Sequence, residues 1–362
     1  MKTLLARLLL ITVISQSAIV FANTAPENII DLQRDAVIYK PSKVIKSFEM
    51  SYPASARRNK VEGYVEVSYD VNEQGSPVNL RYNRISGLDI FETLIEKNFD
   101  DWEFEPANID GVAITQKNLQ RTFTFTLTKL TNKFPEPLMR RRFAKLYLQM
   151  RKLLKDGNYE ELANMLTIMD SANIIRFSEN RQLSLVKFTY LEKTKGSDQD
   201  KIIALENALK DNPRAEKTQK LNSKIKASLF KLYAENNQYR QALIQHSDLS
   251  RSEFSQDLLP DLAATVEQVV AKLNSGEPIA TTVKIDGTDL FTHYLSRRVF
   301  KIEIDNPVSF TELRCGKFNV QMQYAKNTLY QMPFDWDDCK LVLQAPRGSL
   351  VSVSEAAIYD PL

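Results

Sequence analysis

The chain has 362 residues, of which 48 are Lys or Arg and 45 are Asp or Glu, so its formal net charge is only +3. A hydrophobic fraction of 43% excludes a wholly disordered chain, a collagen-like fibre and a multi-span membrane protein. Two cysteines and two histidines exclude a disulfide-dense scaffold and a four-cysteine zinc site, and ten widely spaced glycines exclude dinucleotide-binding and P-loop motifs. At about 100 to 200 residues per domain, the length indicates a multidomain protein.

The first residues have the order of an export signal. Lys2 and Arg7 precede an apolar stretch at residues 8–21, and Ala22 stands where a signal peptidase would cleave. We expect residues 1–22 to be a signal peptide that directs export and is then removed. The alternative is that this segment is retained as an inner-membrane anchor, with the rest of the chain on the outer side of that membrane.

Residues 23–47 are polar with scattered apolar positions. We interpret them as a tether that adds at most a short strand around Val37, Ile38 and Tyr39. The next segment, residues 48–130, has the pattern of an α+β domain.

The first strand of this α+β domain is expected at residues 64–71, where apolar and polar residues alternate. One face of it is apolar, and the other, with Glu66 and Ser68, is expected to face solvent. A turn ending at Gly75 leads to a second strand, so the two form a hairpin. The spacing of apolar residues from Phe91 to Trp102 then predicts one amphipathic helix, which we expect Pro106 to end. A third strand is predicted at residues 121–128, because Phe or Leu alternates with Thr there.

Residues 131–279 change to a helical period. Helices are predicted at residues 138–155, 158–170, 180–194, 199–211, 216–236, 239–247 and 257–274. Similar helix–turn–helix junctions recur about 80 residues apart, with a further break near the midpoint, which indicates an array of helical hairpins similar to degenerate tetratricopeptide repeats. A plain helical bundle is the alternative.

Residues 280–362 return to short alternating runs separated by Gly, Asn and Pro. They predict a small all-β domain, either an antiparallel sandwich or a partly open barrel. Export to an oxidising compartment would join Cys315 and Cys339 in a disulfide.

Motifs for catalysis are not found: G-x-S-x-G, H-E-x-x-H, C-x-x-C and EF-hand patterns do not occur. Basic residues do not gather densely enough to indicate a nucleic-acid-binding surface. We therefore expect a protein that is not an enzyme, with no cofactor, metal, nucleic acid or small-molecule substrate.

Residues 48–130 contain a series of landmarks, which in order are Tyr52-Pro53, Ala54, Ala56, Gly63, Gly75, Ser86-Gly87, Phe91, Trp102-Glu103-Phe104-Glu105-Pro106-Ala107, Gly111, Phe123 and Phe125. Together they resemble the C-terminal domain of the TonB family of periplasmic energy transducers. The Tyr-Pro opening and the Trp-x-Phe-x-Pro-Ala segment are the most specific of them. The resemblance implies a three-stranded antiparallel sheet packed on one long helix.

The resemblance also implies a binding mode. TonB domains bind the TonB box, a short extended segment of TonB-dependent outer-membrane transporters, by adding it as a strand to the free edge of their last strand. The residues implied here are Arg121, Thr122, Phe123, Thr124, Phe125 and Thr126. Tyr52 and Pro53 would lie nearby and help position the partner, or would only fasten the chain to the helix.

This chain departs from force-transducing family members, which have a membrane helix with a His, a long Pro-rich spacer and the TonB domain at the C-terminal end. Here no His precedes His246, the segment between Ala22 and Tyr52 is short, and the chain continues far beyond residue 130. The leading interpretation is a periplasmic interaction protein whose helical domain docks a second protein partner. The alternatives are a membrane-anchored TonB-type transducer and an envelope scaffold that uses the fold structurally.

The predicted third strand is expected at a sheet edge. Exposed edges are usually blunted by charge, proline or bulges, and residues 122–128 contain neither charge nor proline. That composition is expected if the edge pairs with a partner strand. It would also follow if residues 34–42 of the same chain cover the edge.

Overall fold

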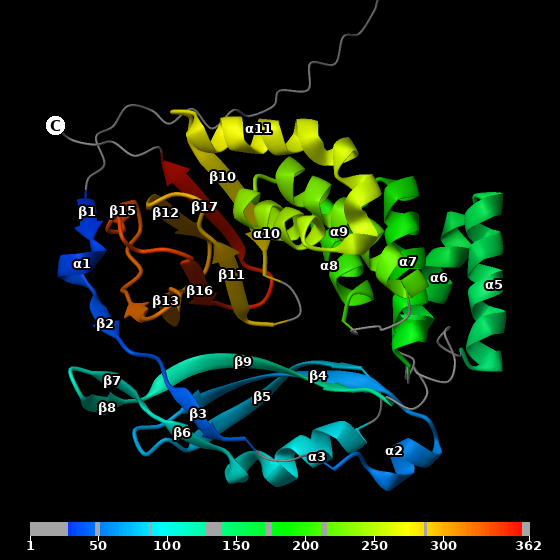
Figure 1. Cartoon of the computed structure of the whole chain (residues 1–362), viewed down its shortest axis with the longest axis horizontal. Coiled ribbons are helices and arrows are strands. Elements are labelled where there is room, and N and C mark those ends of the chain that lie inside the picture. The colour runs from blue at the N-terminus through cyan, green and yellow to red at the C-terminus, as the bar shows by residue number, and fades with distance from the viewer. Residues whose placement is uncertain are drawn as a thin grey trace, which may run out of the picture.

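The computed structural model describes residues 28–47, 51–86, 89–127, 139–170, 176–210, 216–285 and 288–356. The expected signal peptide at residues 1–22 lies outside these ranges. Figure 1 shows a mixed α/β part below, and a stack of sheets and a group of helices above it. We name these parts the α+β unit, the sandwich and the helical region.

The α+β unit is built on a three-stranded antiparallel sheet with the strand order β5-β4-β9. Its elements are α2 (Ala54–Arg58), β4 (Gly63–Val71), β5 (Pro77–Ser86), α3 (Ile90–Asn98), the 3-10 turn η1 (Phe99–Asp101), β6 (Glu103–Glu105), β7 (Ala107–Ile109), β8 (Val112–Ile114) and β9 (Gln116–Phe125). The central strand is β4, in which Val65 lies opposite Ile85 of β5 and Phe123 of β9. Helices α2 and α3 lie under the sheet in Figure 1.

The apolar face of β4 packs on α3, as the alternation predicted. Val65, Val67 and Tyr69 are buried in one hydrophobic cluster with Phe91 of α3 and with Trp102. The cluster belongs to the α+β unit alone, so this part of the chain has its own core.

The helix of this unit is shorter than predicted. It ends at Asn98, whose side-chain amide donates to the Leu94 carbonyl (2.6 Å), and one 3-10 turn follows. Trp102 therefore enters the core from an extended backbone with ψ 137°. The expectation that the helix continues to Pro106 was wrong, because the residues after Trp102 form β6, which pairs with a strand further upstream.

The β4–β5 turn shows why a glycine stands at position 75. Gly75 has φ +81°, and a Cβ there would lie 2.0 Å from the Phe104 carbonyl oxygen. The Gly75 carbonyl in turn accepts the Phe104 N–H (2.9 Å). The turn and β6 are therefore held together where a side chain would separate them.

The helical region follows the predicted pattern closely. Its elements are α5 (Arg141–Asp156), α6 (Tyr159–Asp170), α7 (Phe177–Thr194), α8 (Asp198–Ala208), α9 (Glu216–Glu235), α10 (Tyr239–Ser250), the 3-10 turns η2 (Glu253–Leu258) and η3 (Pro260–Leu262), and α11 (Ala263–Asn274). Gly157, with φ +72°, ends α5, and the Ser197 hydroxyl caps α8 by accepting the Asp200 N–H (3.1 Å).

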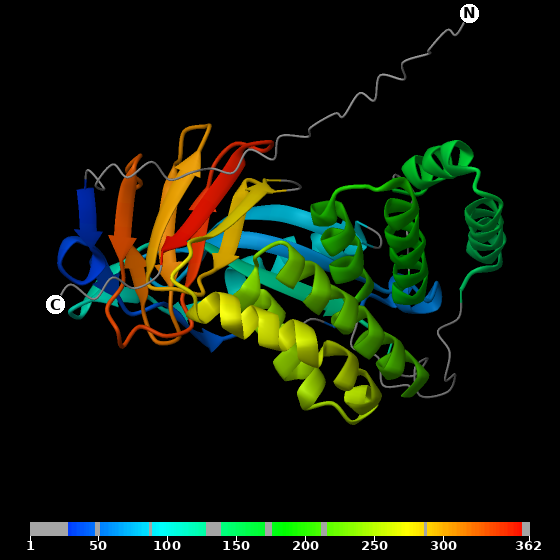
Figure 2. The same cartoon turned by 90° about the horizontal axis from the view of Figure 1, so that it is seen from above.

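Three hydrophobic clusters hold these helices together, and the smallest, with Tyr239 and Val269, joins α10 and α11 to β10. Phe143 and Leu162 belong to the first, which joins α5, α6 and α7, while Leu205 and Phe230 belong to the second, which joins α8, α9 and α10. Figure 2 shows the α5–α6 hairpin at the end of the molecule farthest from the sandwich. An assignment to a particular repeat family stays a prediction.

The sandwich consists of two five-stranded sheets, ordered β1-β15-β12-β17-β10 and β11-β16-β13-β14-β2. Its strands are β1 (Asn28–Asp31), β2 (Val37–Tyr39), β10 (Ile279–Lys284), β11 (Leu290–Tyr294), β12 (Val299–Ile304), β13 (Phe310–Arg314), β14 (Asn319–Gln321), β15 (Thr328–Gln331), β16 (Lys340–Gln344) and β17 (Leu350–Ala356). Phe300, Leu313, Tyr330 and Val351 are fully buried between the sheets.

The expectation of a tether at residues 23–47 was wrong for residues 28–47, although the short strand expected around Val37, Ile38 and Tyr39 is present as β2. β1 pairs in parallel with β15, the one-turn helix α1 (Leu32–Asp35) follows, and β2 pairs antiparallel with β14. Leu32 is fully buried in the core of the sandwich. The next strand, β3 (Lys43–Lys46), pairs with β6 of the α+β unit, so this segment is built into two parts of the protein.

Candidate functional site

The edge strand β9 stands at the end of the three-stranded sheet, next to β4 only. Among the described residues no other strand pairs with its outer edge. Residues 34–42, the expected alternative cover, form no strand pair with β9: β2 pairs with β14, and Lys40 bridges to Asn108. Their contact with β9 is at its first residue, where Ser42 donates to Gln116 Oε1. The strand ends at Phe125, so Thr126 lies just beyond it, and Thr128 lies outside the described residues.

The side chains of β9 divide as the Phe–Thr alternation predicted. Phe123 and Phe125 are buried, and the Phe125 ring stacks on Phe91 with ring centres 4.1 Å apart. Thr122 and Thr124 are exposed. The phenylalanines therefore hold the strand on the core, while the two threonines stand on the other face.

The N–H and C=O groups of successive β9 residues also alternate in direction, and the β4–β5 turn shows which residues point outward. Asn72 N–H donates to the Ser76 carbonyl (3.0 Å), so every second residue of β4 counted back from Asn72 turns its N–H towards β5. The residues between, including Val65, turn towards β9, where Val65 lies opposite Phe123. The N–H and C=O of Phe123 therefore face β4, and those of Thr124 point away from the sheet.

Arg121 has a structural role that its position in the alternation could have revealed. Its guanidinium lies 4.7 Å from the centre of the Trp102 ring and 5.2 Å from that of Phe123. Being two residues before Phe123, Arg121 projects on the apolar side and covers the core there by a cation–π contact. Its side chain is thus already engaged within the α+β unit.

Tyr52 lies beside the end of β9, and Pro53 follows it at the start of α2. The Tyr52 ring meets Phe91 and Phe125 edge-on, with centroids 5.9 and 6.5 Å apart, and its hydroxyl donates to the Val61 carbonyl. Burial raises the pKa of the Tyr52 hydroxyl well above its ordinary value. Pro53 is the N-cap residue of α2. These contacts fasten the chain to α3, and they also place Tyr52 at the end of the candidate edge.

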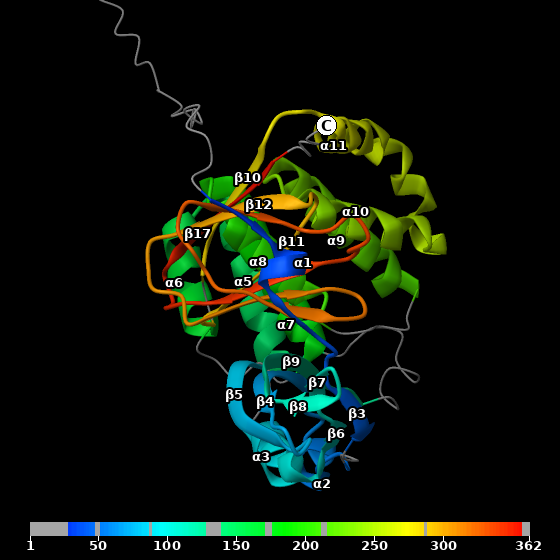
Figure 3. The same ribbon diagram turned by 90° about the vertical axis from the view of Figure 1, so that its left-hand side faces the viewer.

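The polar face of the sheet is not solvent-facing at its centre, which corrects the expectation for Glu66 and Ser68. Ser68 is fully buried, Tyr64 stacks on Phe177 of α7 (6.3 Å), and Glu66 pairs with Lys210 after α8. Burial raises the pKa of Tyr64 to about 12. Figure 3 shows why: the α+β unit lies with this face towards the rest of the protein.

The N-terminal half of β9 also meets the sandwich. Asn118 Nδ2 donates to Gln344 Oε1 (3.2 Å), and Arg314 donates to the Lys117 carbonyl (2.9 Å). A cavity of about 480 Å³ remains among the three parts, with Gln120 of β9 in its wall. The accessible portion of the edge is therefore the C-terminal half of β9, from Thr122 onwards.

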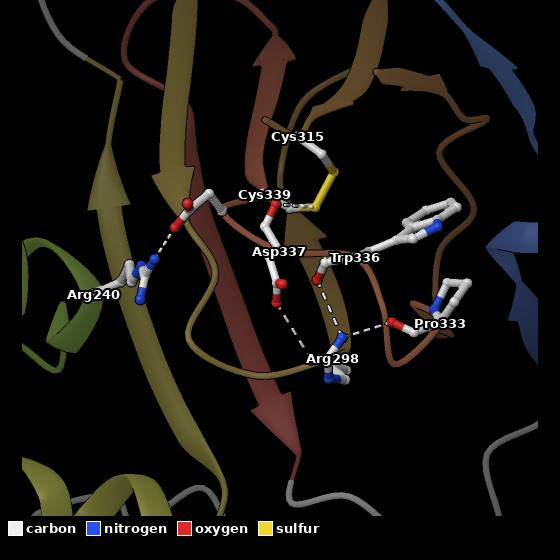
Figure 4. Close-up of a disulfide and its surroundings, with 8 residues drawn as sticks. Arg240, Arg298, Cys315, Pro333, Trp336, Asp337 and Cys339 are labelled. Atoms are coloured by element: carbon white, nitrogen blue, oxygen red, sulfur yellow. Dashed lines mark hydrogen bonds and ion pairs between the residues drawn. A yellow bond between two sulfur atoms is a disulfide. The ribbon is translucent and has the colours of Figure 1, made fainter. Parts of the chain in front are cut away.

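Figure 4 shows that Cys315 and Cys339 form the predicted disulfide, with Cα atoms 4.0 Å apart. It joins the ends of β13 and β16, and β14 and β15 lie in the loop that it closes. Beside it, Arg298 donates to the carbonyls of Pro333 (2.7 Å) and Trp336 (3.1 Å). The disulfide therefore ties the end of β13 to the segment before β16 that contains Trp336. Among the residues that the structure describes, no group of three His, Cys, Asp or Glu side chains could hold a metal ion.

Comparisons with known proteins concern the α+β unit. Residues 49–127 match the family model described as Gram-negative bacterial TonB protein C-terminal. A solution NMR structure of the Pseudomonas aeruginosa TonB C-terminal domain is 21% identical, with 24% of this chain and 86% of that one covered and a TM-score of 0.22. No curated protein matches the chain significantly. The family match is confined to residues 49–127, and this part of the chain is similar to the C-terminal domain of Gram-negative bacterial TonB proteins.

Proposed function

We propose that the α+β unit binds an extended peptide by β-strand addition along the outer edge of β9. The observation that carries this proposal is the edge itself: β9 ends the sheet, and the main chain of Thr124 points outward there. Thr122 and Thr124 are exposed and uncharged, and the side chain of Arg121 is turned to the core side. Such an edge is a template for another strand.

The peptide that fits the family is the TonB box of a TonB-dependent outer-membrane transporter, and the protein would act in the periplasm, in transport across the outer membrane. Main-chain pairing supplies the affinity in this mode, at about 0.5–1.5 kcal/mol net per hydrogen bond. The short accessible length of β9 then favours a modest, reversible affinity. The helical region would hold a second protein partner. No helix among the described residues is long and apolar enough to cross a membrane, and residues 1–22 lie outside that set.

The test uses the full chain and labelled TonB-box peptides, with binding followed by fluorescence anisotropy. Thr124→Pro removes one outward N–H and should abolish binding, whereas Thr124→Ala keeps the main chain and should bind as the wild type does. Circular dichroism checks that both variants fold. Equal binding by the two folded variants would rule out pairing at this edge, and no binding by the wild type would rule out the TonB box as the ligand.

The envelope-scaffold alternative has an observation in its favour. The polar face of the sheet is covered by the chain itself, through Tyr64 on Phe177 and Glu66 on Lys210. A TonB-like unit that is fixed in this way could serve to hold the sandwich and the helical region together. If the unit is a scaffold, Thr124→Pro should leave the binding of every partner of the full chain unchanged. Loss of the contact between Tyr64 and Phe177 should instead weaken the binding of those partners.

A further inference from the structure

Helix α5 has an unusually one-sided charge. Its exposed cations are Arg141, Arg142, Lys145, Arg151, Lys152 and Lys155. The single acid of the helix, Asp156, is already paired with Lys152 (2.6 Å). The charge on the outward face of α5 is therefore mainly positive, while Phe143 and Met150 bury the opposite face.

An apolar groove runs between α5 and α6 beside these cations. Its walls are formed by Arg142, Lys145, Leu146, Met165, Ile168 and Met169, and its volume is about 310 Å³. Apolar side chains make up the floor, and the two cations stand on the rim. Methionine side chains adapt to varied apolar partners, so this floor suits a protruding aliphatic or aromatic side chain.

The position of the groove in the fold makes it accessible to a partner. The α5–α6 hairpin is the first of the helical region and lies at the end of the molecule in Figure 2. The terminal hairpin of a helical stack normally has a polar outer face. Here Leu148 and Ile168 are 64% and 66% exposed, which is high for large apolar residues of a helix pair.

We propose that the α5–α6 groove binds an acidic amphipathic helix of a partner protein. Apolar residues at positions i, i+3, i+4 and i+7 of that helix would fill the groove, and its Asp and Glu residues would face Arg142 and Lys145 on the rim. This specifies the second partner proposed for the helical region, and it does not depend on peptide binding at β9. A groove favours a helix over an anionic membrane, because membrane binding uses a protruding apolar face.

The probe is a labelled synthetic peptide of about five helical turns, with Leu at i, i+3, i+4 and i+7 and mainly Glu elsewhere. It is added to the full chain, and anisotropy is recorded at increasing salt. The peptide should bind, and binding should weaken as salt rises, since the rim contacts are screened. A scrambled peptide of the same composition and vesicles of phosphatidylglycerol should bind much more weakly.

Lys145→Glu reverses a charge on the rim and should weaken peptide binding by about tenfold or more. Lys155→Glu makes the same change on the same helix but outside the groove, and should weaken it by less than about threefold. Both variants should bind a TonB-box peptide as the wild type does, so failure here is distinguishable from failure at β9. Equal binding of the scrambled peptide, equal loss in the two variants, or binding to vesicles alone would overturn the proposal.

Discussion

Replacement of Trp102 by alanine should loosen the α+β unit and leave the sandwich intact. The Trp102 side chain is 2% exposed. Its ring centre lies 5.2 Å from that of Tyr69 and 5.5 Å from those of Phe104 and Phe123, and Arg121 covers it. These four neighbours, together with the Phe99 ring at 6.3 Å, leave little freedom for the cavity to collapse after truncation.

Truncation of a buried Trp or Phe to Ala lowers the free energy of unfolding by about 3–5 kcal/mol, and the loss is towards the upper end of that range when the cavity cannot collapse. Loss of the Arg121 contact adds about 0.5–1 kcal/mol. Since every 1.4 kcal/mol is a factor of ten, amides that exchange by opening of the unit should exchange about two to four orders of magnitude faster.

Hydrogen exchange followed by mass spectrometry on the full chain measures this effect by region. Peptides from β4 and β9 should lose protection in Trp102→Ala, while β16 of the sandwich should keep it. Trp336→Ala is the matched control, because Trp336 is 7% exposed in the sandwich core and should produce the opposite pattern. A change of less than about tenfold in β4 would refute the packing account of Trp102.

Two further predictions concern stability. Thiol labelling of the unfolded, unreduced protein should find no reactive thiol, and Cys339→Ser should cost about 3–4 kcal/mol in the sandwich; two labelled thiols would contradict the disulfide. Burial raises the pKa of Glu62, although the Leu127 N–H donates to it (3.1 Å). The neutral carboxyl of Glu62 therefore contributes stability that is fully present below the ordinary carboxyl pKa. This stability is lost as the pH rises through the raised pKa of Glu62 in the folded protein. Glu62→Gln should match the wild type in acid and exceed it at neutral pH, in urea titrations read by Trp102 fluorescence with Trp336 replaced by Phe in both proteins; a variant that is weaker only at neutral pH would contradict this.

The elements that could be predicted from the sequence are those whose pattern reflects one nearby partner. The alternation in β4 reports a face packed on α3, and the helical period from residue 141 onwards reports hairpins whose helices are neighbours in sequence. With two cysteines in the chain, an oxidising compartment leaves one intramolecular pairing, which the structure contains. Local patterns were sufficient in each of these cases.

The elements that could not be predicted depend on distant partners. β1 is four residues long and is held by β15, so Asn28 lies opposite Thr328. Nothing in the sequence of β4 indicates that Lys210 and Phe177 of the helical region cover its polar face. The contact of Arg121 with the core could have been predicted, because its position two residues before Phe123 places it on the core side of β9.

The central claim is that the outward main chain of β9 pairs with a peptide strand, and residue-resolved amide exchange tests it most directly. In the full chain labelled with [15N]threonine, NMR would follow the Thr122 and Thr124 N–H groups with and without a TonB-box peptide. Both amides should exchange rapidly in the free protein, since no described strand pairs with this edge, and slow markedly when the peptide is bound. Peptide binding that leaves the exchange of both amides unchanged would contradict strand addition at β9.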